Sequence, residues 1–342
     1  MEQRAIRGRR VIRSSAWLLA TAVAGLMTGC PEVGAPSRSV AITALAFSAT
    51  GEMVVSDAAG RIQFLDANAR VMQRIQAHIG SASGVAFNTA SSKVVSVGDD
   101  GRVSIRNRNG ELLVNKSVSS MGLKTVAFQP GATEDTETLA TGGNDGMARI
   151  LRGDNADQVG AELGGHVGAI NSVVYGPAGT AVAGVIITTG DDGTLRGFLA
   201  DGSSANAAFS QDAHNRAGNA VTFSPDGALC PTASDDGIVR VWPAAQAGMP
   251  GWTPLFELPH AAPVLSVAFS PDGAIIGTAS ADGTARLWNS ADGEPLRVLD
   301  GRHTGPINAI AFNPNAASRL VATAGGDGRV VLWNVDTGQP LE

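Results

Sequence analysis

An aromatic residue that recurs at a nearly constant interval is the feature that most constrains this chain. Its seven members are Phe47, Phe87, Phe128, Tyr175, Phe223, Phe269 and Phe312, which are 40, 41, 47, 48, 46 and 43 residues apart. A unit of this size cannot bury its own hydrophobic face, so copies must pack against one another. The interval therefore predicts one array of seven similar units and not a set of unrelated domains.

The pattern inside each unit predicts short β-strands. The clearest copy runs from His260 to Trp288 and alternates apolar and polar residues between glycine-containing turns. Such alternation is typical of half-buried strands. In this copy we expect strands at residues 266–270, 275–280, 284–288 and 295–299. The 43 glycines of the chain suit the many tight turns that such a fold requires.

Two polar residue types keep fixed distances within the units. A histidine lies nine residues before the aromatic in five copies: His78, His166, His214, His260 and His303. An aspartate followed by glycine lies six residues before the end of the third strand in six copies: Asp100, Asp145, Asp192, Asp236, Asp282 and Asp327. The third strand ends in Trp242, Trp288 and Trp333 in three copies. The first unit instead has Ala59 at the aspartate position and Arg38 at the histidine position, and the third unit has Ser119 for the histidine.

These offsets resemble the WD-repeat (G-beta-like repeat) family over residues 38–342. The resemblance implies an all-β fold, a seven-bladed β-propeller of four-stranded antiparallel blades over residues 40–342. It also implies a hydrogen-bonded chain in each blade, formed by the histidine, a hydroxyl of the second strand, the aspartate and the tryptophan. The hydroxyl candidates lie four residues before each aspartate: Ser96, Thr141, Thr188, Thr232, Thr278 and Thr323.

The same reading leaves no residues for catalysis. All five histidines of the chain belong to the expected hydrogen-bonded chains, so none remains as a general base or metal ligand. Signature motifs of serine hydrolases, zinc proteases, P-loop proteins and calcium loops are absent from the sequence. The two cysteines, Cys30 and Cys230, are too few for a disulfide framework or a cysteine-based zinc site. We therefore expect no enzyme, no cofactor and no metal; a hydrolase or a propeller that binds a small ligand in its channel is the less favoured alternative.

The first 29 residues predict a secretory signal. Residues 1–13 are rich in arginine, and an apolar run follows from Ala16 to Met27. Twelve apolar residues are too few to span a bilayer, which takes about 20. The segment Leu26 to Cys30 resembles the lipobox of bacterial lipoproteins, which implies cleavage before Cys30 and lipidation of its sulfur, with residues 30–39 as a linker.

The lipobox predicts a protein that is exported and anchored to a membrane by lipid. Residue 31 is proline and not the aspartate associated with inner-membrane retention, which favours the outer membrane, facing the periplasm. An ordinary signal peptide cut elsewhere, which would leave a soluble periplasmic protein, is the alternative. The segment Cys30 to Ala35 could also supply the outer strand of the seventh blade, although its proline and glycine make a poor strand.

The charge balance bears on the partner class. Of 25 basic and 31 acidic residues, five basic and one acidic lie in residues 1–29, which leaves 20 and 30 in the remainder. An acidic body argues against nucleic-acid binding, because basic surface supplies most of that affinity. We therefore predict a non-catalytic protein-interaction scaffold, expected to be monomeric; an envelope-assembly or structural outer-membrane lipoprotein is the alternative.

A binding face is predicted from the same register. In propellers, ligands usually meet the face built by the loops entering the blades and the turns between second and third strands. The candidate residues on that face are Asp99, Asn144, Asp191, Arg216 and Asp235. Ordinary solvated turn residues are the alternative interpretation, since aspartate and asparagine favour such turns in any case.

Overall fold

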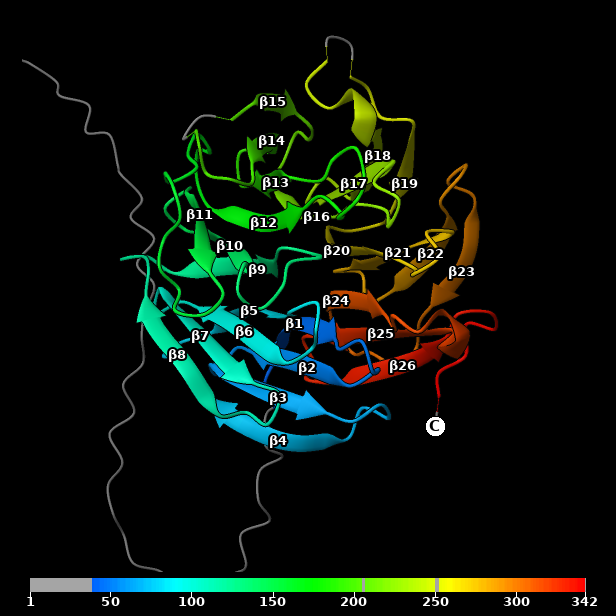
Figure 1. Ribbon diagram of the computed structural model, residues 1–342. Coiled ribbons are helices and arrows are strands. Elements are labelled where there is room, and N and C mark those ends of the chain that lie inside the picture. The colour runs from blue at the N-terminus through cyan, green and yellow to red at the C-terminus, as the bar shows by residue number, and fades with distance from the viewer. Residues whose placement is uncertain (1–38, 205–206, 250–251, 342) are drawn as a thin grey trace, which may run out of the picture. The chain divides into compact units, whose positions relative to one another are not determined.

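A ring of seven antiparallel β-sheets makes up the described part of the chain (Figure 1). The computed structural model describes residues 39–204, 207–249 and 252–341. The expected signal peptide and Cys30 lie outside these residues. Each sheet is one blade, and the blades follow one another in sequence order around the centre. The expected seven-bladed all-β propeller is confirmed.

The strands recur in the same order in every blade. The first, innermost strands are β1 (Ile42–Phe47), β5 (Ala82–Phe87), β9 (Leu123–Phe128), β12 (Ile170–Tyr175), β16 (Gly218–Val221), β20 (Val264–Phe269) and β24 (Ile307–Phe312). The second strands are β2 (Met53–Asp57), β6 (Lys93–Gly98), β10 (Thr138–Gly143), β13 (Val185–Gly190), β17 (Leu229–Ser234), β21 (Ile275–Ser280) and β25 (Leu320–Gly325). The third strands are β3 (Arg61–Leu65), β7 (Arg102–Asn107), β11 (Ala148–Arg152), β14 (Thr194–Leu199), β18 (Ile238–Pro243), β22 (Ala285–Asn289) and β26 (Val330–Asn334).

The outer edge of the ring is less regular. Fourth strands are β4 (Val71–Gln76), β8 (Leu112–Ser117), β15 (Phe209–Asp212), β19 (Phe256–Pro259) and β23 (Pro295–Leu299). Blades 3 and 7 have three strands each in the described residues. In blade 3 the outer position is held by isolated bridges from Leu163 and Gln158, and in blade 7 by one from Pro340 to Trp333. Two 3-10 turns, η1 (Ala244–Gln246) and η2 (Ala316–Ser318), follow β18 and precede β25.

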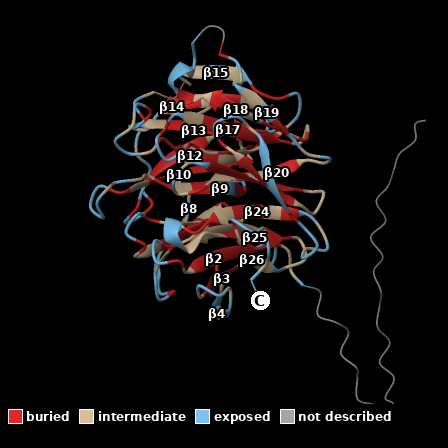
Figure 2. Ribbon diagram, turned by 90° about the vertical axis from the view of Figure 1, so that its right-hand side faces the viewer, coloured by how far each residue is buried: buried red, intermediate tan, exposed pale blue. Residues whose placement is uncertain are grey.

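The hydrophobic core lies between blades, because every sheet has two faces and both are covered by neighbours. One cluster of buried side chains fills each of the seven interfaces. The second strands are accordingly buried along nearly their whole length, and exposed residues gather in the loops and outer strands (Figure 2). Each fully buried Leu or Ile contributes about 1.5–3 kcal/mol to this arrangement.

Side chains close the ring between the last blade and the first. The cluster there joins Ile42 and Met53 of blade 1 to Ala322 and Leu332 of blade 7. Asn308 Nδ2 in β24 also donates a hydrogen bond of 2.7 Å to the Ile42 carbonyl in β1. Equivalent bonds join blades 4 and 5, from Asn171 Nδ2 to the Gly218 carbonyl, and blades 5 and 6, from Asn219 Nδ2 to the Val264 carbonyl. The interface between the first and last blades therefore resembles the others.

Candidate functional site

Buried histidine–aspartate pairs tie the loop entering a blade to the turn between its second and third strands. In blades 2, 4, 5 and 7 the histidine Nδ1 lies 2.9, 2.9, 3.0 and 3.1 Å from the aspartate, in the pairs His78–Asp100, His166–Asp192, His214–Asp236 and His303–Asp327. The other ring nitrogen, Nε2, meets a hydroxyl of the second strand, in order Ser96, Thr188, Thr232 and Thr323. These imidazoles are thus hydrogen-bonded at both nitrogens.

Tryptophan completes the chain in the three C-terminal blades. The indole Nε1 donates to the same threonine hydroxyl that meets the histidine, in the pairs Trp242–Thr232, Trp288–Thr278 and Trp333–Thr323, at 2.9, 2.9 and 2.8 Å. The chain expected from the sequence is complete in blades 5 and 7. Its members are largely shielded from solvent and hydrogen-bonded to one another, which stabilises the fold.

The aspartate of blade 4 shows what such a residue does. Asp192 Oδ2 accepts a hydrogen bond of 3.0 Å from the Val167 amide in the entering loop, and Oδ1 accepts one of 3.1 Å from the Thr194 amide in the turn. Burial favours the neutral acid, but the Val167 amide and His166 outweigh it and lower the pKa of Asp192 to about 2. The carboxylate is therefore ionised and holds two backbone segments together.

Three of the histidines, His166, His214 and His260, are disfavoured in the charged form. Burial lowers the pKa of His166 and of His214, against the opposing effect of their aspartates. For His260, burial and the Arg286 guanidinium together lower the pKa to about 4. Their side chains are 0% exposed. A shielded imidazole is a poor candidate for a general base, since a base must reach the proton that it abstracts.

Blade 6 departs from the expected chain although its sequence follows the pattern most closely. His260 Nδ1 lies 3.7 Å from Asp282 Oδ2, too far for a hydrogen bond, and this ring nitrogen has no partner in the described residues. Asp282 Oδ1 instead accepts bonds from the amide and hydroxyl of Thr284 at 2.8 and 2.7 Å. The predicted His260–Asp282 link is therefore wrong, because the 3.7 Å between the two atoms exceeds hydrogen-bond distance.

Blade 3 lacks both the histidine and the tryptophan. Ser119 Oγ donates to Asp145 Oδ2 at 3.0 Å, and Arg149 Nη2 approaches the same oxygen at 2.7 Å. The serine is too short to reach Thr141, whose buried hydroxyl has no partner among the described residues. Leu151, at the tryptophan position, offers no N–H. The expectation that Thr141 joins a chain is therefore wrong.

Blade 1 contains an anchor that the sequence analysis missed. Asp57, the last residue of β2, is 0% exposed and lies two residues before Ala59. Its Oδ1 accepts from the amides of Ala59 and Arg61 at 2.9 and 3.1 Å, and its Oδ2 from Arg61 Nε at 2.8 Å. The turn is therefore tied by a carboxylate from a shifted position. An aspartate directly before the Ala-Ala-Gly turn was the available signal.

The five predicted binding residues lie in the loops and turns of one face. Asp99 and Asp191 are exposed, Asn144 and Asp235 are half-buried, and Arg216 is exposed in the loop entering blade 5. The three aspartates also have local roles: they accept from the Ser81 amide, the Ala169 amide and Asn219 Nδ2, at 3.2, 3.1 and 2.7 Å. Turn chemistry explains these contacts, but it does not explain which side chains the loops expose.

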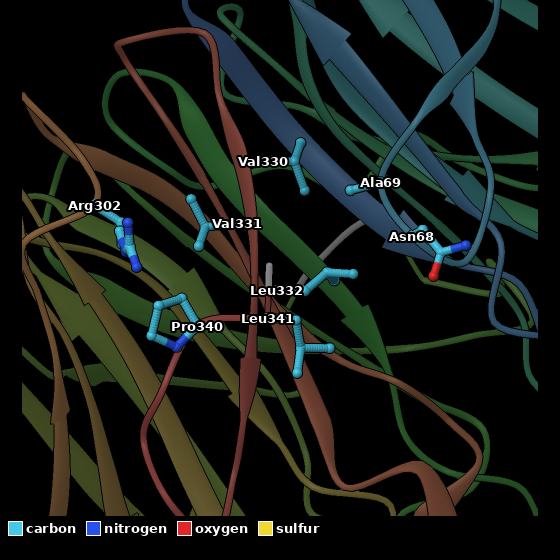
Figure 3. A pocket seen from close by; sticks show the side chains of 8 residues that line it. All are labelled: Asn68, Ala69, Arg302, Val330, Val331, Leu332, Pro340 and Leu341. Atoms are coloured by element: carbon cyan, nitrogen blue, oxygen red, sulfur yellow. The ribbon is translucent and has the colours of Figure 1, made fainter.

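Two cavities of the ring, in the central channel and beside blade 7, contain few chemically active groups. The central channel holds a cavity of about 250 Å³ lined by the first strands, where Lys124 is the one ionisable side chain. A cavity of about 330 Å³ lies at the outer side of blade 7, with Val330, Leu332 and Leu341 in its wall and Arg302 as its one ionisable side chain (Figure 3). A lone lysine or arginine does not make a nucleophile–base pair. Within the described ranges, no three His, Cys, Asp or Glu side chains are grouped to hold a metal.

Seven blades of repeated sequence, of which four contain a His–Asp hydrogen bond and three a Trp–Thr hydrogen bond, define a repeat-built β-propeller. The family model described as WD domain, G-beta repeat matches residues 158–198, 208–243, 252–289 and 293–334. These segments cover the outer part of blade 3 to the third strand of blade 7. The chain is a WD-repeat β-propeller, as the spacing predicted.

One further comparison and one structural finding concern the wider context. No match to the sequence was found among curated proteins. Over the described ranges, the fold contains no helix with the length and apolar character needed to cross a bilayer. WD-repeat propellers commonly serve as protein-interaction scaffolds and are typically non-catalytic.

Proposed function

We propose that this protein is a non-catalytic protein-interaction scaffold, monomeric and held on the export side of a bacterial membrane by a lipid on Cys30. The observation that supports a scaffold is that the buried polar side chains hold the loops of one face in place. The His–Asp pairs fasten the entering loops to the turns, as in blade 4, where Asp192 holds the Val167 amide at 3.0 Å. The loops are thereby rigid before any partner binds, which lowers the entropic cost of association.

The fold supports binding over catalysis in a second respect. A hydrolase would need a nucleophile within reach of a base, and the buried imidazoles are engaged at both nitrogens in blades 2, 4, 5 and 7. The unoccupied nitrogen of His260 is buried, with its side chain 0% exposed. Protein binding needs neither group, only a shaped and rigid surface.

The membrane anchor rests on the sequence. Cys30 directly follows Leu26-Met27-Thr28-Gly29, and Pro31 favours the outer membrane with the propeller in the periplasm. Each buried CH₂ of an acyl chain contributes about 0.8 kcal/mol, so several chains anchor a protein firmly. The acidic body then stays clear of anionic lipid headgroups by charge.

The test compares the wild type with Cys30→Ala in the native host. We expect the wild type in the membrane fraction with lipid on Cys30, detected by mass spectrometry, and the variant in the soluble periplasmic fraction. Cys230→Ala serves as the matched control, since it removes the other thiol and should stay membrane-bound. Equal partitioning of wild type and Cys30→Ala would refute the anchor.

The scaffold is tested by affinity purification of the detergent-solubilised protein. We expect a defined set of co-purifying proteins that withstand moderate salt. If membrane β-barrel proteins dominate that set, the scaffold works in envelope assembly. If nothing co-purifies while a small molecule raises the unfolding temperature, the scaffold is wrong and the central channel is the functional site.

A further inference from the structure

Three exposed apolar side chains stand on neighbouring entering loops. They are Ile79, Met121 and Val167, with exposed fractions of 82%, 48% and 78%, on the loops that lead into blades 2, 3 and 4. Ile79 and Met121 are 42 positions apart in the sequence, and Met121 and Val167 are 46 apart. The ring places their loops on adjacent blades. We call this part of the face, with Asp99, Asn144 and Asp191, the blade 2–4 sector.

Contacts between loops and turns make the sector continuous. The Gly101 carbonyl in the blade 2 turn accepts a bond of 3.2 Å from the Ser119 amide in the next loop, and the Gly122 carbonyl accepts one of 2.8 Å from the Asn144 amide. A side chain built on Gly146 in the blade 3 turn would lie 2.9 Å from the His166 carbonyl, so this turn also abuts the next loop. Apolar and polar residues therefore alternate along one surface.

The backbone that carries two of the apolar side chains is held in place. The Ile79 amide donates to Asp100 Oδ2 and the Val167 amide to Asp192 Oδ2, both at 3.0 Å. The fold requires only the backbone of these residues, because their side chains point into solvent. The equivalent residues of blades 5, 6 and 7 are Asn215, Ala261 and Thr304. Large aliphatic side chains are thus a property of this sector and not of the repeat.

The sector also carries exposed carboxylates outside any ion pair, and the exposed Lys124 of blade 3 lines the central channel. Arg149 is paired with Asp145 at 2.7 Å and with Glu162 at 2.8 Å, and the Arg196 guanidinium lies 3.7 Å from Asp192. Asp99 and Asp191 are exposed, and no cation of the described chain lies within ion-pair distance of either. A partner that covers the sector must therefore bring both apolar and positive groups.

We propose that the blade 2–4 sector binds an extended segment of a partner protein in which every second residue faces the sector and these residues are in turn large aliphatic and basic. The inference rests on the proposed scaffold function and specifies the partner for it. Aliphatic side chains of the segment would cover Ile79, Met121 and Val167, and its cations would pair with Asp99 and Asp191. This spacing suits the sector, because successive side chains of an extended chain point to opposite sides and only every second one faces the protein.

A synthetic probe tests the proposal with the purified propeller. The probe is a fluorescein-labelled peptide of about ten residues, about 33 Å long when extended, in which every second residue is in turn valine or lysine and serine fills the positions between. One comparator replaces its lysines with glutamate, and another replaces its valines with serine. Fluorescence polarisation should show binding at least about tenfold tighter for the probe than for either comparator. Equal binding of the three peptides would overturn the proposal, and so would no binding.

Variants of the protein locate the binding. Ile79→Ser with Val167→Ser, and separately Asp99→Asn with Asp191→Asn, should each weaken probe binding about tenfold or more. The matched control is Leu112→Ser with Leu113→Ser, which removes apolar side chains of 50% and 51% exposure from the outer strand β8. The control should bind like the wild type, and all variants should keep the wild-type unfolding temperature. Wild-type affinity in both sector variants, or an equal loss in the control, would place binding elsewhere.

The two proposals fail in different ways. If affinity purification recovers partners but the sector variants recover them equally, the scaffold stands and the sector is wrong. If the peptide binds the sector while the host yields no partner, the surface chemistry stands and the scaffold function is wrong.

Discussion

His260 Nδ1 and Asp282 Oδ2 lie 3.7 Å apart in blade 6, whereas the same pair is hydrogen-bonded at 2.9–3.1 Å in blades 2, 4, 5 and 7. The imidazole of His260 is therefore buried without the carboxylate contact that would favour its protonation. Burial and the nearby Arg286 lower its pKa to about 4. This relationship makes blade 6 one of the acid-sensitive points of the ring.

The first prediction concerns pH. An unfolded histidine takes up a proton below about pH 6.5, whereas folded His260 stays neutral down to about pH 4. The unfolded state then binds more protons in this window, so the free energy of unfolding falls as pH falls, by about 1.4 kcal/mol per unit for each such histidine. The lowered pKa values of His166 and His214 act in the same direction.

Urea unfolding between pH 7 and pH 4 measures this slope. His260→Gln should have a shallower slope than the wild type, because one of the linked protons is removed. Below about pH 4, Asp192 lowers the free energy of unfolding further. Its carboxylate takes up a proton there in the unfolded state, whereas in the fold its pKa is about 2. An identical slope in His260→Gln and wild type would show that this histidine is not buried in its neutral form.

The second prediction uses two threonines at the same register. Thr323 Oγ1 meets His303 Nε2 at 2.9 Å and Trp333 Nε1 at 2.8 Å, whereas Thr141 Oγ1 is buried without a partner in the described chain. Thr323→Val should cost about 1–3 kcal/mol of unfolding free energy, because it leaves buried donors unpaired. Thr141→Val should be neutral or stabilising. Chemical unfolding of both variants decides this, and equal costs would contradict it.

The third prediction concerns the anchor of blade 1. Asp57→Ala removes the acceptor of the Ala59 and Arg61 amides and leaves the turn between β2 and β3 untied. We expect a loss of about 2–3 kcal/mol, because Asp57 is 0% exposed. Asp66→Ala is the control: its carboxylate also accepts two amides, but on the exposed surface, where water replaces it. A cost for Asp57→Ala no larger than that of the control would argue against an anchoring role.

The fourth prediction concerns the thiol of Cys230. It lies in β17, opposite Trp242 in β18, is 0% exposed, and burial raises its pKa. Since the thiolate is the reactive form, alkylation of the native Cys30→Ala protein at pH 8 should be very slow. Labelling should become fast in urea, at the concentration where blade 5 unfolds. Rapid labelling of the native protein would mean that blade 5 opens locally.

Much of the fold could be predicted because the repeat is strict. The expected strands at residues 275–280 and 295–299 coincide with β21 and β23, since apolar alternation and flanking turns define both ends locally. The aromatic residue ends the first strand of six blades, and in blade 5 Phe223 lies two residues beyond β16. Short-range patterns specify these elements because the strands and hairpins are themselves local.

The site was less predictable, because hydrogen bonds depend on where neighbouring segments meet. A residue count placed Ala59 at the anchor position, yet Asp57 reaches the same turn from the end of β2. The count also gave His260 an aspartate partner whose carboxylate lies 3.7 Å from the ring nitrogen, beyond hydrogen-bond distance. A difference of less than 1 Å separates a bond from a contact, and sequence spacing does not resolve it.

The sequence by itself determined the number of units, their strands and the residues able to join a hydrogen-bonded chain, because periodic alternation and turn chemistry are local properties. Only the tertiary structure decided that Ile79, Met121 and Val167 stand on one arc, that the ring closes through Asn308 and Ile42, and that Thr141 is left unpaired. These outcomes depend on how blades pack around a closed ring, where residues distant in sequence become neighbours and each contact depends on both sides of an interface.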